Sequence, residues 1–370
     1  MNNRIILIMQ LLSLGWCAFF AEAFQPHYHQ GLVPARVAGE SRGEYVVLSE
    51  AGTFLARCSG RLAHRASTRR DYPAVGDWVA ITGDGASTTT IHALLPRRTI
   101  LSRAEVSGGA EQVMAANVDT LFIITGLDHN YNLRRIERYL VLGRQSGAEP
   151  VVLLNKADLC AETEERRRAV ETVARDAPVI SLSALTGDGI DAIQPFLTEG
   201  RTVALLGSSG VGKSTLVNRL CGDTVQVTAE VREDDSRGRH TTTARHLIPI
   251  PGGGLLIDTP GMRELGIWEG GDGLDASFDE VSALVARCKF RDCRHESESG
   301  CAILTALESG ELDPMRFAGW EKLRREQAAA NRRRDDAARR LATQQWKRRT
   351  REQRKSRRFN DLNDNPDSGH

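Results

Sequence analysis

Residues 201–220 carry the groups needed to hold a chain of phosphates. An apolar run at 203–206 predicts a buried parallel strand, and helical spacing resumes after residue 214. The segment between them matches the G-x-x-x-x-G-K-[ST] pattern of a phosphate loop, in the strand-to-helix context which that pattern requires. The predicted nucleotide-contacting residues here are Gly207, Ser208, Ser209, Gly210, Val211, Gly212, Lys213, Ser214 and Thr215.

The residue types of this loop fit their expected tasks. Glycines let several backbone N–H groups converge on a phosphate, and the following helix adds its positive N-terminal end. We expect Lys213 to reach the β- and γ-phosphates and Ser214 to ligate Mg²⁺. A plain glycine-rich turn is the alternative, but both flanks favour a nucleoside triphosphate site.

A second motif, at 155–158, can select the base. It follows an apolar run, at the carboxyl end of a predicted parallel strand, where α/β sheets bind ligands. Asp158 can accept from guanine N1–H and the 2-amino group, Asn155 can contact the opposite base edge, and the Lys156 stem can lie across the ring. A further strand ends in Ser183 and Ala184, where a backbone N–H could meet the guanine carbonyl.

Two later segments can respond to the γ-phosphate. Asp258 ends a short apolar run and can hold Mg²⁺ through water, while the Gly261 N–H can contact the γ-phosphate, although D-x-P-G is also good turn chemistry. Residues 236–243 are polar and rich in hydroxyl groups, as expected of a switch loop whose threonine closes on Mg²⁺. We favour Thr242 for that role, with Thr241 as the alternative.

Three cysteines and one histidine lie within 14 residues near the C-terminal end: Cys288, Cys293, His295 and Cys301. Three thiolates and one imidazole close a tetrahedral structural zinc site and leave no open position for catalysis. Unligated core cysteines are the alternative, but the intervening residues are too polar for a core strand. We expect one structural Zn²⁺ that clamps a small helical domain.

Composition sets the broad class of the protein. The 370 residues are 26% charged and 41% apolar, typical of a soluble globular chain and not of a fibrous or disordered one. The seven cysteines are odd in number and four are scattered, which argues against a disulfide framework. Residues 321–358 hold 16 lysines and arginines against 5 acidic residues, so a basic arm follows a mildly acidic body. Such an arm suits contact with a nucleic-acid backbone, and a solvated charged helix is the alternative.

The N-terminus resembles a signal peptide, because Arg4 precedes a largely apolar run at 5–20. Polar residues interrupt that run, and triphosphates and reduced cysteines belong inside the cell. We therefore favour an apolar docking segment, or a translation start later than Met1, and expect a cytoplasmic protein without stable membrane insertion.

The pattern of predicted elements indicates several domains. Five short strands between 32 and 95 have the size of a small Greek-key barrel such as an OB-fold. Residues 97–112 look like a linker. From 117 onward, strands at 120–125, 150–154 and 178–182 alternate with helices at 133–144 and 158–174, which implies a parallel sheet covered on both faces.

The order of the motifs is unusual. Ordinary GTPases carry the phosphate loop first and the N-K-x-D motif near the end, whereas here 155–158 and 183–185 precede 207–214, 239–243 and 258–261. The chain therefore resembles the circularly permuted GTPases of the RsgA family, from Leu14-Gly15-Trp16 through to the zinc site. The resemblance implies an N-terminal OB-fold β-barrel, a central permuted α/β GTPase domain and a C-terminal helical zinc-binding domain.

The resemblance also implies the function: GTP hydrolysis stimulated by the 30S ribosomal subunit, during late maturation of that subunit and its 16S rRNA. Met262 occupies the position where many GTPases place a water-orienting glutamine, so another group must act. His240, in the switch loop, is the candidate that the family favours, with Lys213 and Thr242 as the other catalytic residues. An exposed loop histidine is the alternative reading of His240.

The expected domain boundaries are an extension at 1–31, the OB-fold at 32–95, a linker at 96–112, the GTPase domain at 113–270, the zinc-binding domain at 271–345 and a basic, then disordered tail at 346–370. We expect a monomer that binds GTP and GDP. Two other functions compete: a GTP-dependent RNA-binding module with negligible turnover, and an exported enzyme that uses ATP.

Overall fold

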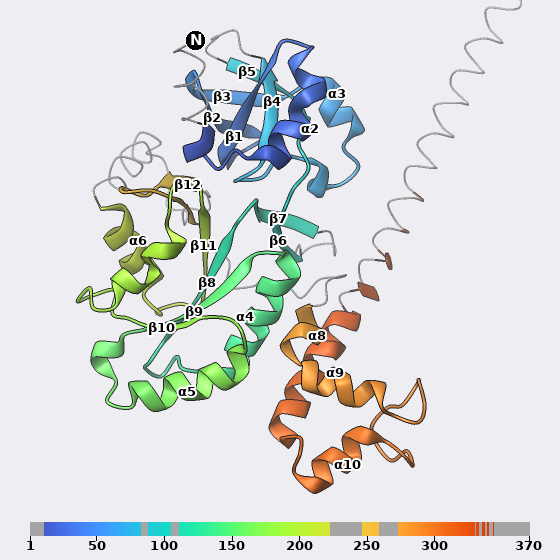
Figure 1. Ribbon diagram of the computed structural model, residues 1–370. Coiled ribbons are helices and arrows are strands. Elements are labelled where there is room, and N and C mark those ends of the chain that lie inside the picture. The colour runs from blue at the N-terminus through green and yellow to red at the C-terminus, as the bar shows by residue number, and fades with distance from the viewer. Residues whose placement is uncertain are drawn as a thin grey trace, which may run out of the picture.

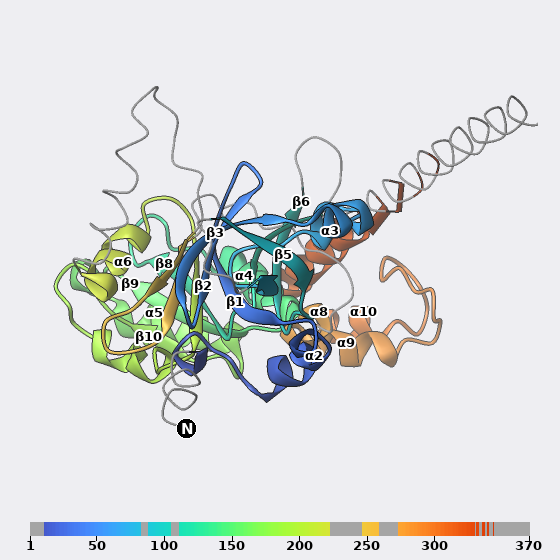
Figure 2. The ribbon, with the colours of Figure 1, turned by 90° about the horizontal axis from the view of Figure 1, so that it is seen from above.

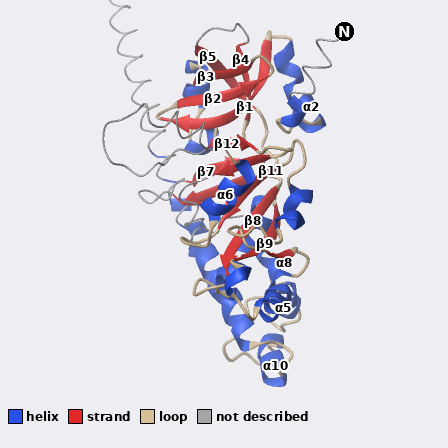
Figure 3. Cartoon of the chain, turned by 90° about the vertical axis from the view of Figure 1, so that its left-hand side faces the viewer, coloured by secondary structure: helices blue, strands red, loops and turns tan. Residues whose placement is uncertain are grey.

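The computed structural model describes residues 11–82, 88–104, 111–222, 246–258 and 273–329, and a few positions between 331 and 343. A β-barrel lies at one end of the molecule and the cysteine-rich helical region at the other, with a sheet of mainly parallel strands between them (Figures 1 and 3). No helix in the described part of the chain is both long enough and apolar enough to span a membrane.

Five strands form the N-terminal barrel, and all five were expected from apolar clusters separated by turn residues. They are β1 (Leu32–Ser41), β2 (Glu44–Ser49), β3 (Gly52–Cys58), β4 (Trp78–Thr82) and β5 (Thr88–Leu94). β1 pairs with β2 and β4, β2 with β3, and β5 with both β3 and β4, so the sheet closes on itself. This order, with β3 and β5 parallel, confirms the OB-fold prediction. Short helices α3 (Gly60–Arg65) and η1 (Arg69–Asp71) connect β3 to β4.

The apolar N-terminal segment packs on the barrel from Leu11 onward. Helix α2 (Ala18–Tyr28) lies along its outside (Figure 2) and buries Phe20 and Phe24 against Trp78. This is the docking segment that the sequence suggested; residues 1–10 lie outside the described residues. The aromatic cluster gives the helix its position, because Phe20 and Phe24 are its two buried residues.

A buried arginine joins the N-terminal segment, the barrel and the central domain. Arg36 of β1 is 1% exposed and donates to the carbonyl oxygens of Leu14, Gly76 (3.2 Å) and Asn117 (3.1 Å). Gly15 has φ +87°, and a Cβ there would lie 2.8 Å from both the Arg36 guanidinium and the Gly200 carbonyl oxygen. The glycine of the Leu14-Gly15-Trp16 motif is therefore required by close packing.

The central sheet has the order β10-β9-β8-β11-β13-β12, and a single pairing of β12 with β1 continues it into the barrel. Its strands are β8 (Thr120–Gly126), β9 (Glu149–Asn155), β10 (Val179–Ser181), β11 (Thr202–Leu206), β12 (His246–Pro249) and β13 (Leu255–Asp258). All neighbours are parallel except β12, an antiparallel strand that the sequence analysis did not anticipate.

Helices cover both faces of this sheet, as predicted. On one face, Leu121 and Ile123 of β8 pack in the core beneath α4 (Leu133–Ser146) and α5 (Thr163–Ala174). On the other face, Phe122 and Ile124 pack in the core beneath α6 (Lys213–Cys221) and η3 (Ile190–Phe196). The two-residue period of a strand produces this division.

Two local expectations need correction. The supposed linker contains β6 (Ile100–Ala104) and the first two residues of β7 (Glu111–Ala116), and these strands pair as a two-stranded sheet. The helix expected from 158 begins only at 163, since a 3₁₀ turn, η2 (Ala157–Leu159), comes first. Lys156, immediately before η2, has φ +66°, so the chain turns sharply there.

The C-terminal region is helical. It contains α8 (Gly273–Ser277), α9 (Asp279–Ala286), α10 (Ala302–Ser309) and a further helix over residues 314–329. Apolar residues from this region, including Phe278, Ile303 and Trp320, belong to the same core as Leu140 and Val141 of α4. α4 is therefore the element of the central domain against which this region packs (Figure 1).

Candidate functional site

The predicted nucleotide-binding motifs meet at one edge of the central sheet. β9 ends at Asn155, β11 at Leu206 and β13 at Asp258, and these strands are parallel. Their carboxyl ends therefore lie side by side, at the edge where open α/β sheets bind ligands.

Asn155 connects three of the motifs directly. Its side chain is 2% exposed; Oδ1 accepts the Ala184 N–H at 2.8 Å and Nδ2 donates to the Val211 carbonyl oxygen at 2.7 Å. A Cβ at Gly212 would come within 2.2 Å of Nδ2, so only glycine fits there. Segments separated by 29 and 56 residues are thus held together by one amide, which fixes the base-selecting loops relative to the phosphate loop.

The phosphate loop has the expected backbone. Gly210 and Gly212 have φ of +77° and +95°, and α6 starts at Lys213. The Lys213 ammonium donates to the carbonyl oxygens of Gly207 at 2.7 Å and Ser208 at 2.6 Å. These carbonyls hold the lysine within the loop, at the place from which it could reach bound phosphates.

At the base-selecting end, Lys156 is held by a carboxylate. Its ammonium donates to Asp128 Oδ2 at 2.7 Å, and the backbone N–H of Asn130 donates to Asp128 Oδ1 at 2.9 Å. Burial alone would raise the pKa of Asp128, but these hydrogen bonds lower it to about 2. Asp158 lies in η2 and is exposed. Ser183 is fixed by two hydrogen bonds: its hydroxyl oxygen accepts from the Thr186 N–H, and its own N–H donates to the Asp188 carbonyl oxygen.

The predicted Mg²⁺ ligands occupy adjacent elements. Ser214 is exposed in the first turn of α6, and Asp258 is the last residue of β13, one position beyond the paired residues Ala204 and Ile257. Hydroxyl and carboxylate oxygens are ligands that Mg²⁺ accepts. His240, Thr241, Thr242, Gly261 and Met262 lie outside the described residues.

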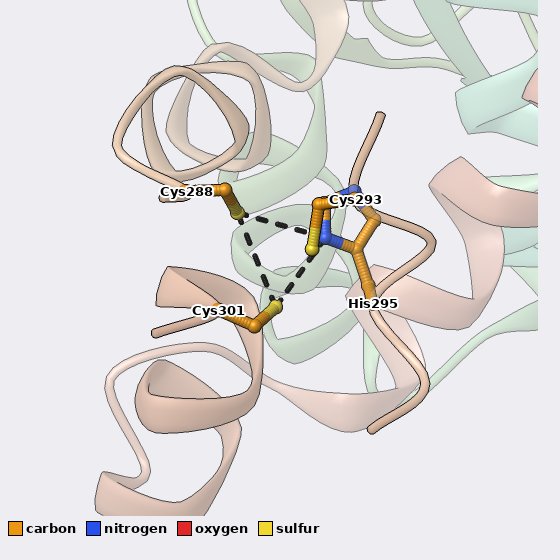
Figure 4. A group of neighbouring side chains, drawn as sticks. All are labelled: Cys288, Cys293, His295 and Cys301. Carbon is orange, nitrogen blue, oxygen red and sulfur yellow. Dashed lines mark hydrogen bonds between the residues drawn. The ribbon is translucent and has the colours of Figure 1, made fainter. Parts of the chain in front are cut away.

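The four predicted zinc ligands come together (Figure 4). Their ligand atoms all lie within 4.8 Å of one another. Cys288 Sγ is 3.9 Å from Cys301 Sγ and 3.7 Å from His295 Nδ1, and His295 Nδ1 is 3.4 Å from Cys301 Sγ. A tetrahedral zinc with bonds of about 2.3 Å to sulfur and 2.0 Å to nitrogen requires ligand separations of about 3.5 to 3.8 Å. The donor set and its spacing fit a structural zinc ion.

Helix ends and turns position these ligands. Cys301 is the N-cap of α10, Cys288 follows α9 by two residues, and His295 adopts φ +65° in the intervening loop. Burial raises the pKa of the Cys288 thiol, but hydrogen bonds from the backbone N–H groups of Ala302 and Ile303 and with the thiols of Cys301 and Cys293 together lower it overall. The start of α10 thus favours the thiolate form that a metal requires.

Two residues beside the nucleotide motifs were not found from the sequence. Asp128 pairs with Lys156, and Arg135 Nη1 donates to the Ser208 hydroxyl at 2.9 Å. Asp128 lies two residues after β8, whose carboxyl end reaches the same sheet edge, and Arg135 lies in the first turn of α4, the next helix. The only available signal was polar residues at the end of a buried parallel strand, which is weak without the structure.

Comparison with known proteins agrees with this architecture. The RsgA GTPase family profile matches residues 94–268. The small ribosomal subunit biogenesis GTPase RsgA of Opitutus terrae is 52% identical over 335 residues, covering 86% of this chain and 90% of the relative. The crystal structure of YjeQ from Thermotoga maritima superposes with a TM-score of 0.59 at 27% identity, covering 79% of this chain and 97% of that one. YloQ, described as a circularly permuted GTPase, superposes with a TM-score of 0.57 at 25% identity, covering 81% and 96%.

The matched relatives and structures cover most of the chain, and this coverage agrees with the permuted motif order and with the three regions of the fold. The closed barrel, the central sheet and the Cys₃His cluster all occur where the resemblance of the sequence placed them. This chain belongs to the RsgA family of circularly permuted GTPases and is a GTP hydrolase.

Proposed function

We propose that the protein binds the 30S ribosomal subunit through its 16S rRNA and hydrolyses GTP there as a late checkpoint of subunit maturation. The observation that carries this proposal is the 52% identity, over 86% of the chain, to a GTPase named for small ribosomal subunit biogenesis. Such a factor acts in the cytoplasm, where the subunit is assembled, and we expect it to act as a monomer.

The positive charge of the basic segment at 321–358 supports contact with RNA. The 314–329 helix carries Arg324, stacked at 4.8 Å over the Trp320 ring, and Arg325, whose side chain is 72% exposed. It leads into the basic segment noted in the sequence. Arginines at this density suit the phosphate backbone of RNA, so binding should weaken steeply as salt is raised.

In the proposed GTP complex, Asp158 reads the guanine donors, Lys156 covers the ring and a backbone N–H of the 183–185 segment meets the guanine carbonyl. Lys213 exchanges its two carbonyl partners for the β- and γ-phosphates. Ser214 and Asp258 would hold Mg²⁺, which neutralises charge on the phosphates. Gly261 and Thr242 would close on the γ-phosphate, and His240 would orient the attacking water. The Cys₃His cluster would hold Zn²⁺ and keep the C-terminal helices together.

Phosphate release with and without purified 30S subunits tests the proposal. We expect slow release by the protein alone and a large acceleration by 30S subunits, with no comparable effect of 50S subunits. GTP-dependent binding to 30S without acceleration would instead favour a binding module with negligible turnover. His240→Ala should abolish the stimulation while binding persists; stimulation that survives this change would show that another group orients the water.

A further inference from the structure

Arg135 contacts the phosphate loop although it belongs to none of the nucleotide motifs. It lies in the first turn of α4, where its backbone N–H donates to the side chain of the N-cap residue Asn132 at 3.1 Å. Its half-buried guanidinium then reaches the Ser208 hydroxyl at 2.9 Å, across 73 residues of chain. The cap fixes the start of the helix, so the arginine is held toward the loop.

Ser208 also contacts the ammonium group of Lys213, so it lies at the positively charged end of the phosphate loop. Its carbonyl oxygen accepts from the Lys213 ammonium at 2.6 Å, while its hydroxyl oxygen accepts from Arg135. A phosphate-loop lysine serves the β- and γ-phosphates, so both cations stand at the γ-phosphate end of the site. Of the two, only Lys213 is part of the sequence motif.

The direction of this hydrogen bond leaves the Ser208 hydroxyl proton available to donate to a phosphate. An arginine side chain can only donate, so the Ser208 hydroxyl oxygen accepts the hydrogen bond from Arg135. The hydroxyl proton of Ser208 is therefore not used in this hydrogen bond. Phosphate oxygens are acceptors only. A Ser208 hydroxyl held by Arg135 is therefore suited to donate to a γ-phosphate oxygen, and the adjacent guanidinium adds positive charge there.

We propose that Arg135 is a positioning residue for GTP: through Ser208 it orders the phosphate loop for a nucleotide that carries a γ-phosphate. The inference rests on the proposed placement of GTP in this loop. It predicts discrimination between GTP and GDP, because GDP lacks the group that the ordered hydroxyl would meet.

The test is equilibrium binding of fluorescent GTP and GDP analogues to the full-length protein, without ribosomal subunits. Arg135→Ala should weaken GTP binding about tenfold, the usual effect of one hydrogen bond to a charged group, and GDP binding less than threefold. Arg135→Lys should recover much of the loss. Ser208→Ala should reproduce it, and the double variant should be no worse than either single one, because both act through one hydrogen bond.

Arg134→Ala is the matched control. It removes the neighbouring arginine of α4, whose Nη1 donates to Glu137 and not to the phosphate loop, and it should leave the GTP-to-GDP ratio unchanged. Equal loss of GTP and GDP binding in Arg135→Ala, without rescue by Arg135→Lys, would show a merely structural role and overturn the proposal. Unchanged binding of both nucleotides in Arg135→Ala would overturn it too. Failure of the proposed ribosomal function would appear separately, as absent 30S stimulation in a wild-type protein that binds GTP normally.

Discussion

Removal of Arg316 should detach the C-terminal helices from α4. Its guanidinium donates to Glu137 Oε1 at 2.7 Å and to Glu280 Oε1 at 2.6 Å, contacts the Ser277 carbonyl oxygen, and stacks at 3.9 Å over the Phe278 ring. Glu137 belongs to α4 of the GTPase domain and is 3% exposed. One arginine therefore connects this helix to the C-terminal region through a buried ion pair.

The magnitude follows from the buried carboxylate. In Arg316→Met, Glu137 keeps only Arg134, at 3.1 Å, as an ion-pair partner and remains inside the protein. Removal of one partner of a buried pair costs about 3 to 5 kcal/mol, because the other charge stays desolvated. With a urea dependence of about 2 kcal/mol per molar, the midpoint for this region should fall by about 2 M.

Trp320 provides the readout, because it is 4% exposed in the 314–329 helix and becomes solvated when that helix leaves α4. Its emission, isolated by replacing the other four tryptophans with phenylalanine, should shift to the red at the lower urea concentration. Arg325→Met is the control: Arg325 pairs with Glu321 at the surface and should cost less than about 1 kcal/mol.

A second substitution separates the ion pair from simple packing. Glu137→Gln combined with Arg316→Met removes both charges and should restore most of the lost stability, as replacement of buried ion pairs by uncharged residues often does. The reasoning is wrong if Arg316→Met costs no more than Arg325→Met, or if the double variant is as unstable as the two single effects added together.

Three further predictions concern the metal and the nucleotide site. Zinc removal by a strong chelator, or Cys293→Ser, should unfold the C-terminal helices while GTP binding persists. Metal analysis and the helical signal in circular dichroism check this, and unchanged helicity after chelation would contradict a structural metal. Asp128→Asn should weaken GTP binding severalfold by releasing Lys156. Because the pKa of Asp128 is about 2 in the folded protein against an ordinary 3.8, its stabilisation is complete above about pH 4 and is lost as pH falls toward 2. The stability difference between wild type and Asp128→Asn, followed by urea titration, should therefore be constant from pH 5 to 7 and shrink only below pH 4. Asn155→Ala leaves the buried N–H of Ala184 unpaired, so it should destabilise the protein by about 1 to 3 kcal/mol and weaken GTP binding; a neutral outcome in urea titration would contradict the bridging role.

The sequence predicted those features that local patterns encode. Apolar clusters separated by turn residues located the five barrel strands, and apolar runs located the parallel strands β8, β9 and β11. The motifs came together because each follows such a strand, and parallel strands bring their ends to one edge. The zinc ligands were predictable because they lie close in sequence and their residue types suit only a few uses.

Other features depend on contacts between distant residues and carry no local pattern. β12 is four residues long and adopts its place by pairing with β13. β6 and the start of β7 lie in the polar segment 97–112, and these strands form by pairing with each other and by burying Leu101 and Met114 in the core. The hydrogen bond from Arg135 to Ser208 spans 73 residues and that from Arg316 to Glu137 spans 179. A single arginine on a helix is ordinarily solvated, so residue type alone does not reveal such partners.

α4 combines these two long-range contacts in one rigid element. Arg135 and Glu137 are two positions apart, which places them on opposite sides of a helix with 3.6 residues per turn. One side reaches the phosphate loop at Ser208 and the other holds Arg316 of the 314–329 helix. α4 thus connects the phosphate loop to the C-terminal region through two side-chain contacts, one at Ser208 and one at Arg316. Because these contacts share no side chain, loss of Arg316 should release the C-terminal region and leave the contact between Arg135 and Ser208 intact.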